Sequence, residues 1–388
     1  MKRICAILLA LMLLMTLVAC GSDNKGSSGS NSDAIKIGLT TVLTGDRSLE
    51  GEYASNVVKI FEEEINSAGG VLGRPIEVVI EDAQGNDVGA VAAWKKLAAN
   101  NDIVAIISSD SSNDNLAVAD LAMEQEILTT GQGSSPTLRD VCNANPWMFQ
   151  LRACDETLCA ALMNFAVEEL GYRTFAIINE TESSSADQAK LFKDALAKHG
   201  ITPSVEVSFA TGTKDLTAQL VQIQQANVDA VVGAAFSDQA ALLLQQMRAI
   251  GMQDMPVFGS NGFTDPVTIR LAGDAVEGVY AAAHWSPDTT SPKGSALAKK
   301  YKDLYGEDCG KSAAQVYDHL SVLCEAIRIA GTTDRAAVRD AMNKISDFEG
   351  CMTNYDCTTN GDCGRGGVLV QAQNGRAVVL DNIISKKD

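Results

Sequence analysis

From residue 35 onward the sequence predicts an α/β protein built on parallel sheets. Short runs rich in β-branched residues alternate with amphipathic stretches, and neighbouring parallel strands need crossover connections of this kind. About 355 residues follow the first 33, which is more than one hydrophobic core normally serves. We therefore expect two domains, with doubly wound parallel sheets covered by helices on both faces.

The alternation can be followed in order along the chain. The run IKIGLT precedes a helical stretch in which Tyr53, Val57, Ile60 and Phe61 fall on one face. IEVVIED is followed by DVGAVAAWKKLAAN, and IVAIIS by DNLAVADLAMEQ. The runs FAIIN, VDAVVGAA, PVFGS and EGVYAAA continue the pattern, each beside a helical stretch. Ligands of such folds bind outside the carboxyl ends of the strands, so we expect the functional residues directly after each strand.

The chain begins with a segment typical of an exported protein. Lys2 and Arg3 precede an apolar run that ends at Ala19, and this run is short for a helix that spans a bilayer. The residues LVAC at its end resemble the lipobox of bacterial lipoproteins, in which the cysteine, here Cys20, is lipidated and becomes the first residue. An ordinary signal peptide cut nearby, or an uncleaved anchor, is the alternative.

The lipoprotein interpretation gives the chain a location. Residues 1–19 would be the signal peptide, and residues 20–33, rich in Gly, Ser, Asp and Asn, would be a flexible tether. Several acyl chains hold a protein on a membrane firmly, whereas one holds weakly. We therefore expect the protein on the extracytoplasmic face of the bacterial cell membrane, anchored through Cys20.

The charge of the chain argues against some partners. It carries 31 Lys and Arg residues against 49 Asp and Glu residues, a net charge of −18, and loss of Lys2 and Arg3 with the signal peptide makes it about −20. Nucleic acids and anionic lipid headgroups both need a basic surface. We expect no nucleic acid partner, and the lipid at Cys20 is the expected contact with the membrane.

Eight cysteines remain beyond Cys5 and Cys20. In an exported chain an even count favours disulfides, although a large domain does not depend on them. The eight are Cys142, Cys154, Cys159, Cys309, Cys324, Cys351, Cys357 and Cys363. We expect at least two of the last three to form a disulfide, and Cys154 and Cys159 to pair or to pack together.

The segments after the predicted strands are rich in small hydroxyl residues. They read TTVLTGDRSLEG, SSDSSNDN, TGQGSSP, NETESSSAD, AAFSDQ and GSNGFTD. Ser111 and Ser112 precede a predicted helix, and Ser134 and Ser135 lie in a glycine-bearing turn. Hydroxyls beside the free N–H groups of a helix start suit a carboxylate or another compact anion. The alternative is that these serines only cap helices and fill turns.

Motifs of enzymes, cofactors and metal sites are not found. The three histidines, His199, His284 and His319, are far apart, and GQGSSP lacks the third glycine of a dinucleotide fingerprint. The spacing of the last three cysteines is wider than is usual for zinc. The stretch DCTTNGDCG resembles part of a calcium loop, yet Gly367 stands where the bidentate glutamate should be. We expect a protein that is not an enzyme and holds no cofactor or metal.

The chain resembles a known family from about Ile35 to its C-terminus. IKIGLTTVLTG, EEEINSAGGVLGRPIEVVIED, LAVADLAMEQEIL, SSPTL, VDAVVGAAFSDQAALLLQQMRAIGM, GSNGFTD and AGDAVEGVYAA resemble, in that order, the leucine/isoleucine/valine-binding family of ABC transporter substrate-binding proteins. INSAGGVLGRPIE is the most specific part. The resemblance implies the type 1 periplasmic-binding fold, in which two lobes are joined by three crossing segments and clamp the ligand between them.

The resemblance also implies boundaries for the lobes. The N-terminal lobe would comprise residues 34–150 and 286–350, and the C-terminal lobe residues 151–285 and 351–388. The chain would cross between them near Gln150, near Trp285 and near Gly350.

The function implied is that of an extracellular solute-binding lipoprotein of an ABC importer. It would clamp an amino acid, branched-chain-like or a related small polar solute, and deliver it to the permease subunits in the membrane. A ligand-sensing extracellular module, or a binder of a small amide or organic acid, is the alternative. A secreted hydrolase is disfavoured because no catalytic triad or metal set is found.

Carried over to this sequence, the resemblance assigns part of the ligand site. Ser112 and the backbone beside it, including that of Ser111, would meet the ligand's carboxylate, with Gly133 and Ser134 completing this part from the same lobe. Phe236 falls where the family often has an aromatic ring against the ligand.

Other positions depart from the family. Asn261 falls where amino-acid binders commonly carry an acid for the α-ammonium, and Ser184 and Glu50 fall where an aromatic residue is often found. An amide cannot neutralise an ammonium, and a buried unpaired charge is costly. Either another carboxylate, such as Asp238, Glu180 or Glu50, takes over, or the ligand carries no ammonium.

Overall fold

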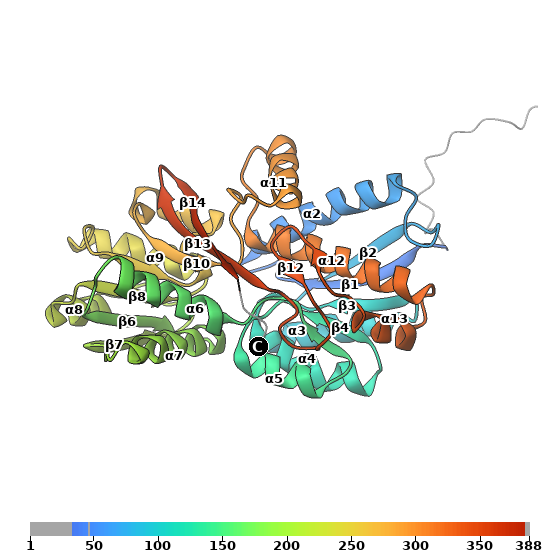
Figure 1. Cartoon of the computed structure of the whole chain (residues 1–388), viewed down its shortest axis with the longest axis horizontal. Coiled ribbons are helices and arrows are strands. Elements are labelled where there is room, and N and C mark those ends of the chain that lie inside the picture. The colour runs from blue at the N-terminus through green and yellow to red at the C-terminus, as the bar shows by residue number, and fades with distance from the viewer. Residues whose placement is uncertain (1–32, 46, 385–388) are drawn as a thin grey trace, which may run out of the picture. The chain divides into compact units, whose positions relative to one another are not determined.

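The structure is a computed structural model that describes residues 33–45 and 47–384. The predicted signal peptide, Cys20 and nearly all of the predicted tether lie outside these residues. The described part forms two large sheets, each flanked by helices, and confirms the predicted fold of two α/β lobes (Figure 1). Within this part no helix combines the length and the apolar character needed to cross a membrane.

The first lobe is built on a five-stranded parallel sheet in the order β2-β1-β3-β4-β5. Its strands are β1 (Ile35–Thr41), β2 (Ile76–Asp82), β3 (Ile103–Ile107), β4 (Leu128–Gly131) and β5 (Met148–Gln150). One side carries α2 (Ser48–Ser67), α12 (Lys311–Ala330) and α13 (Arg335–Met342), and the other carries α3 (Asp87–Ala98), α4 (Ser112–Glu124) and α5 (Pro136–Ala144) (Figure 1). Helix α11 (Pro292–Tyr305) packs on α2 through Tyr301 and Tyr53.

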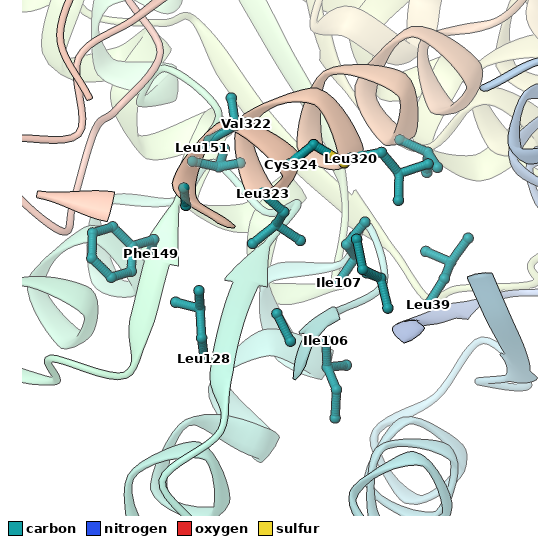
Figure 2. Close-up of a cluster of buried hydrophobic side chains, with 14 of the residues drawn as sticks. Leu39, Ile106, Ile107, Leu128, Phe149, Leu151, Leu320, Val322, Leu323 and Cys324 are labelled. Atoms are coloured by element: carbon teal, nitrogen blue, oxygen red, sulfur yellow. The ribbon is translucent and has the colours of Figure 1, made fainter. Parts of the chain in front are cut away.

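The core of the first lobe joins segments that are far apart in the sequence. Figure 2 shows Leu39 and Ile107 of the strands in the same cluster as Leu320 and Leu323 of α12, and none of these four side chains is exposed. Each such side chain contributes about 1.5–3 kcal/mol when fully buried. The packing therefore fixes α12 on the sheet, and with it Lys311 at the start of this helix.

The second lobe is built on a seven-stranded sheet in the order β14-β13-β10-β9-β8-β6-β7. Its strands are β6 (Phe175–Glu180), β7 (Val205–Phe209), β8 (Ala230–Ala234), β9 (Val257–Gly259), β10 (Tyr280–Ala283), β13 (Gly366–Gln373) and β14 (Arg376–Ile384). Its helices are α6 (Asp155–Asn164), which continues as a π-turn (Phe165–Glu169), α7 (Ser183–Lys198), α8 (Thr217–Ala226), α9 (Ser237–Ala249) and α10 (Pro266–Ala272), with short 3₁₀ turns η2 (Asn261–Phe263) and η3 (Gly273–Val276). Neighbouring strands are parallel except at β13, which is antiparallel to both β10 and β14 and forms a hairpin with β14 at one edge.

The described chain passes between the lobes three times. It leaves β5 for α6, which packs on α7 and β13, and it leaves β10 for α11. It returns to β13 after a short hairpin of β11 (Phe348–Glu349) and β12 (Asn354–Tyr355). These passages are the three crossing segments expected of the fold.

The third passage lies close to β5. Cys351, Tyr355 and Cys363 pack in the core of the first lobe, and the backbone N–H of Cys363 donates to the carbonyl of Gln150 at 3.0 Å. A Cβ on Gly364 would lie 2.6 Å from the carbonyl oxygen of Leu151, so these two segments touch. The lobe boundaries stay a prediction. We propose that the third crossing lies near Gly364, and not near Gly350 as the sequence predicted.

The eight cysteines of the described residues are buried free thiols in the structure. Cys357 and Cys363 are joined by a hydrogen bond between their side chains, and Cys154 and Cys159 are 2% and 3% exposed at the start of α6. The disulfide stays a prediction, and Cys357 with Cys363 is the pair whose side chains are already in contact.

Candidate functional site

Two cavities lie where the carboxyl ends of the strands of both lobes meet. The smaller one, here called the serine cavity, has a volume of about 30 Å³. The first lobe and its crossing segment supply Asp110, Ser112, Ser134, Arg152 and Lys311 to its walls, and the second lobe supplies Ser184, Ser185, Gln188, Ala235, Phe236, Ser237, Ser260, Asn261 and Gly262. Both lobes thus contribute polar groups to one enclosed space.

The larger cavity, here called the acidic cavity, has a volume of about 250 Å³ and shares Phe236 with the serine cavity. Its charged lining residues are Arg47, Asp87, Asp114, Glu180, Glu182 and Asp238. Burial raises the pKa of Asp114 to about 6 and also raises the pKa of Glu180. The acidic cavity is therefore a poor place for a further anion.

Close packing of two loops brings the predicted serines together. Asn115 of α4 accepts a hydrogen bond from the backbone N–H of Gly133 at 2.8 Å, and Ser112 Oγ accepts one from the N–H of Ser135 at 3.3 Å. A Cβ on Gly133 would lie 2.6 Å from Ser112 Oγ. Only glycine therefore allows this approach, which places Ser112 and Ser134 on the same wall of the serine cavity.

Arg152 is a buried cation in this wall. Its side chain donates to the carbonyl of Gln132 at 3.0 Å and to Ser134 Oγ at 2.7 Å, while its Nε has no hydrogen-bond partner. Within the described residues no carboxylate lies in ion-pair contact with this guanidinium, and the residue is 7% exposed. Burial lowers the pKa of Arg152, because a charge is costly in such surroundings.

Asp110 lies at the centre of a second group of charges. Its carboxylate is 3.3 Å from Arg47 Nη1 and 3.1 Å from Lys311 Nζ. Burial by itself would raise the pKa of Asp110, but Lys311 and Arg47 outweigh it and hold this pKa well below its usual range. Burial and the neighbouring Asp110 raise the pKa of Glu50 to about 8. The raised pKa favours the protonated form of Glu50 at neutral pH, beside the carboxylate of Asp110.

Several contacts join the two lobes around the cavities. Ser237 of α9 donates to Glu50 at 3.5 Å, and the guanidinium of Arg47 lies 4.3 Å from the centre of the Phe236 ring. Ser111 Oγ donates to Glu182 at 3.2 Å. The two lobes are thus in direct contact beside both cavities.

A packed turn places Asn261 in the serine cavity. Phe263, which is fully buried, lies so close to the sheet that a Cβ on Gly233 or on Gly259 would be 2.2 Å from its ring. Asn261 Oδ1 accepts a hydrogen bond from the backbone N–H of His284 at 2.9 Å. Because a backbone N–H can only donate, this bond fixes the amide, and the NH₂ group remains for a ligand.

The predicted site residues fall into three groups in the structure. Ser112, Ser134, Ser184, Phe236 and Asn261 line the serine cavity. Ser111, Glu180 and Asp238 line the acidic cavity with Phe236. Gly133 and Glu50 line neither but contact residues that do. Their roles in binding stay predictions.

Four charged residues of the site were missed in the sequence. Arg47, Asp110, Arg152 and Lys311 come from the turn before α2, the loop after β3, the first crossing and the start of α12. No motif links these segments. The one available signal was a charged residue inside a polar loop after a strand, as Asp110 is in SSDSSNDN.

Comparisons with known proteins agree on one family. The model of the periplasmic binding protein family matches residues 34–377. The leucine-, isoleucine-, valine-, threonine- and alanine-binding protein of Pseudomonas aeruginosa is 25% identical over 331 residues, which cover 85% of this chain and 87% of that protein. The crystal structure of the leucine-binding protein LivK of Thermotoga maritima is 26% identical and has a TM-score of 0.82, covering 90% of this chain and 99% of that one.

A third relative shows the fold with another kind of ligand. It is the solute-binding protein of an ABC transporter from Rhodopseudomonas palustris, solved in complex with 3,4-dihydroxybenzoic acid. It is 19% identical, with a TM-score of 0.83, and the match covers 92% of this chain and 99% of that one.

Proposed function

This chain belongs to the periplasmic binding protein family that includes the leucine-, isoleucine- and valine-binding proteins, and from that membership we propose that it is the solute receptor of an ABC importer. In this proposal Cys20 carries the lipid that holds the protein on the extracytoplasmic face of the cell membrane. The receptor binds a small carboxylate between its lobes and delivers it to the permease subunits.

The observation that carries the proposal is the serine cavity, whose walls come from both lobes. Neither lobe alone offers a complete site, so a ligand gains all its contacts only when the lobes are closed. A ligand with such a preference shifts the population of the protein toward the closed form. That coupling is what a receptor needs in order to signal to a permease that it is loaded.

In this proposal the two ends of the serine cavity bind different parts of the ligand. Ser112 and Ser134 would hold a carboxylate through their hydroxyl groups, and Gly133 would help by keeping the two loops close together. Phe236 and Asn261, with Ser184, would meet the rest of the molecule from the second lobe. The relative from Pseudomonas aeruginosa is named for leucine, isoleucine, valine, threonine and alanine, so the first ligands to test are amino acids and their close carboxylate analogues.

A thermal-shift screen tests the proposal directly. The purified protein without its predicted signal peptide and tether, residues 34–388, is heated with amino acids, organic acids, small amides and sugars. A ligand that binds only the folded state at a hundred times its Kd adds about 2.7 kcal/mol of stability, so a carboxylate should raise the melting temperature by several degrees. A response to sugars or amides with none to any carboxylate would contradict the proposed site.

A further inference from the structure

We propose that the cargo is an organic acid anion without an α-ammonium group, and that Arg152 is its main cationic contact. This rests on the proposed function, because it concerns the ligand of the same site. Three features of the site point to this cargo: Arg152 has no carboxylate in direct contact among the described residues, Asp110 is already in ion pairs, and Asn261 presents a hydrogen-bond donor.

Arg152 supplies a positive charge that no carboxylate of the described residues meets in a direct ion pair. Its guanidinium lines the serine cavity and bonds to a carbonyl and a hydroxyl, both neutral. Its buried Nε has no partner. A buried charge without a counter-charge is strongly unfavourable, and a carboxylate placed in the cavity between Arg152 and Ser112 would provide one.

The nearest acid on the crossing segment does not fill this role. Asp155 accepts a hydrogen bond from Gln188 at 2.8 Å and lies 3.7 Å from the ring of His284. Burial raises the pKa of Asp155, although the charge of Arg152 opposes this. Asp155 thus interacts with Arg152 through space without forming an ion pair, and it does not line the serine cavity.

The one acid in the wall of the serine cavity is already matched. Asp110 is held in two ion pairs, with Arg47 and with Lys311. An ammonium would have to compete with two buried cations for this carboxylate. The charged side chains that line the cavity are Arg152, Lys311 and Asp110, so its walls carry one more positive charge than negative.

The far end of the cavity offers a donor where an ammonium needs an acceptor. The oxygen of Asn261 is bound to the N–H of His284, which leaves the amide NH₂. The other candidates for this role, Asp238 and Glu180, line the acidic cavity, and Glu180 is bound to the backbone N–H of Phe236 at 3.2 Å. A hydroxyl, a carbonyl or a second carboxylate suits this end of the cavity better than an ammonium does.

Matched pairs of acids test the inference by calorimetry. Each amino acid is compared with the same molecule lacking the amino group: L-leucine with 4-methylpentanoate, L-phenylalanine with 3-phenylpropanoate, and L-glutamate with glutarate. An ammonium facing Asn261 loses its solvation without gaining a partner, which is costly. We expect the acid without the amino group to bind at least about tenfold more tightly, since 1.4 kcal/mol is a factor of ten.

Variants at Asn261 and Arg152, with a control at Asn382, locate the residues responsible for the preference. Asn261→Asp keeps the acceptor for His284 and adds a negative charge, so it should move the preference toward the amino acids by about tenfold or more. Asn382→Asp, on an exposed residue of β14 that lines neither cavity, is the control and should leave the preference unchanged. Arg152→Gln should weaken binding of the acids at least about tenfold while Arg152→Lys retains part of it.

The outcomes separate this inference from the proposed function. Tighter binding of the amino acids to the unmodified protein, or no change of preference in Asn261→Asp, would overturn the inference and leave a carboxylate receptor. Binding of none of the six acids would overturn the carboxylate site itself. If Arg152→Gln fails to fold, the preference of the unmodified protein and the Asn261→Asp variant still decide the question.

Discussion

Glu50 is a buried acid beside the serine cavity, and its protonation state changes the charge of this region. It lies 7% exposed in the first turn of α2, between Asp110 of its own lobe and Ser237 of the other. The raised pKa favours a neutral Glu50 at neutral pH, while Lys311 and Arg47 keep Asp110 negatively charged. The position was predicted as a departure from the family, but its partners come from distant segments and could not be predicted.

The raised pKa of Glu50 predicts how the stability of the protein depends on pH. A group whose pKa is higher in the folded state stabilises the protein below its unfolded pKa, near 4.5, and this contribution is lost as the pH rises through about 8. Glu50→Gln keeps a neutral hydrogen-bond donor for Asp110 at every pH. Relative to this variant, the unmodified protein should lose a few kcal/mol of unfolding free energy between pH 5 and pH 9.

Denaturant titrations at the two pH values measure this difference. Glu52→Gln, on an exposed residue of the same helix, is the matched control and should follow the unmodified protein. An equal dependence on pH in the Glu50→Gln variant and in the unmodified protein would show that Glu50 is ionised throughout.

Asp238 gives a second test at the residue scale. It is half-buried in the first turn of α9 and lines the acidic cavity beside Phe236. An acid in this turn is favourable whatever the ligand, and a partly exposed charge contributes about 0.2–1 kcal/mol. Asp238→Asn should therefore change the affinity for the cargo by no more than about fivefold by calorimetry, whereas a loss of a hundredfold would assign Asp238 to an ammonium.

At the scale of elements, the loops that follow β3 and β4 form the carboxylate side of the site. The sequence predicted these loops as polar, and the alternation of strands and helices placed them at one edge of a sheet. Their contact could not be predicted, because it depends on Asn115 reaching the backbone of Gly133. The hairpin of β13 and β14 was also missed, since it does not belong to the strand–helix alternation.

The tight approach at Gly133 predicts the effect of a single methyl group. In Gly133→Ala the new Cβ would lie 2.6 Å from Ser112 Oγ and 2.8 Å from the side chain of Leu138. We expect a loss of about 1–3 kcal/mol of stability and at least a tenfold loss of affinity, because Ser112 and Ser134 are pushed apart.

Gly171→Ala separates these two effects. Gly171 has a φ of 83° and open space around it, so this variant should lose about 1 kcal/mol without a change in affinity. Equal affinity of Gly133→Ala and the unmodified protein would show that the cargo does not depend on this pair of loops.

At the scale of the whole molecule, the two-lobed fold and the membrane anchor are supported by different observations. The two-lobed fold was predicted from the alternation of strands and helices and from the resemblance, and the family match confirms it. The anchor at Cys20 lies outside the described residues, so it stays a prediction from the sequence. The identity of the ligand depends on side chains that both lobes bring together. For this reason it could not be predicted from the sequence.

The anchor predicts where the protein is found in the cell. If Cys20 carries the lipid, Cys20→Ala should move the protein from the membrane fraction to the soluble exported fraction, because the variant lacks the predicted attachment to the bilayer. Cys5→Ala is the matched control and should stay with the membranes. Retention of the Cys20→Ala protein on the membrane would contradict the lipoprotein prediction.

Closure of the two lobes on a small carboxylate can be measured by small-angle X-ray scattering. The radius of gyration is measured for residues 34–388 alone and with a saturating amount of the acid that gives the largest thermal shift. We predict that it falls on binding to the value calculated for the closed arrangement, in which Ser111 contacts Glu182 and Ser237 contacts Glu50. A radius of gyration that stays the same at saturation would contradict the clamp.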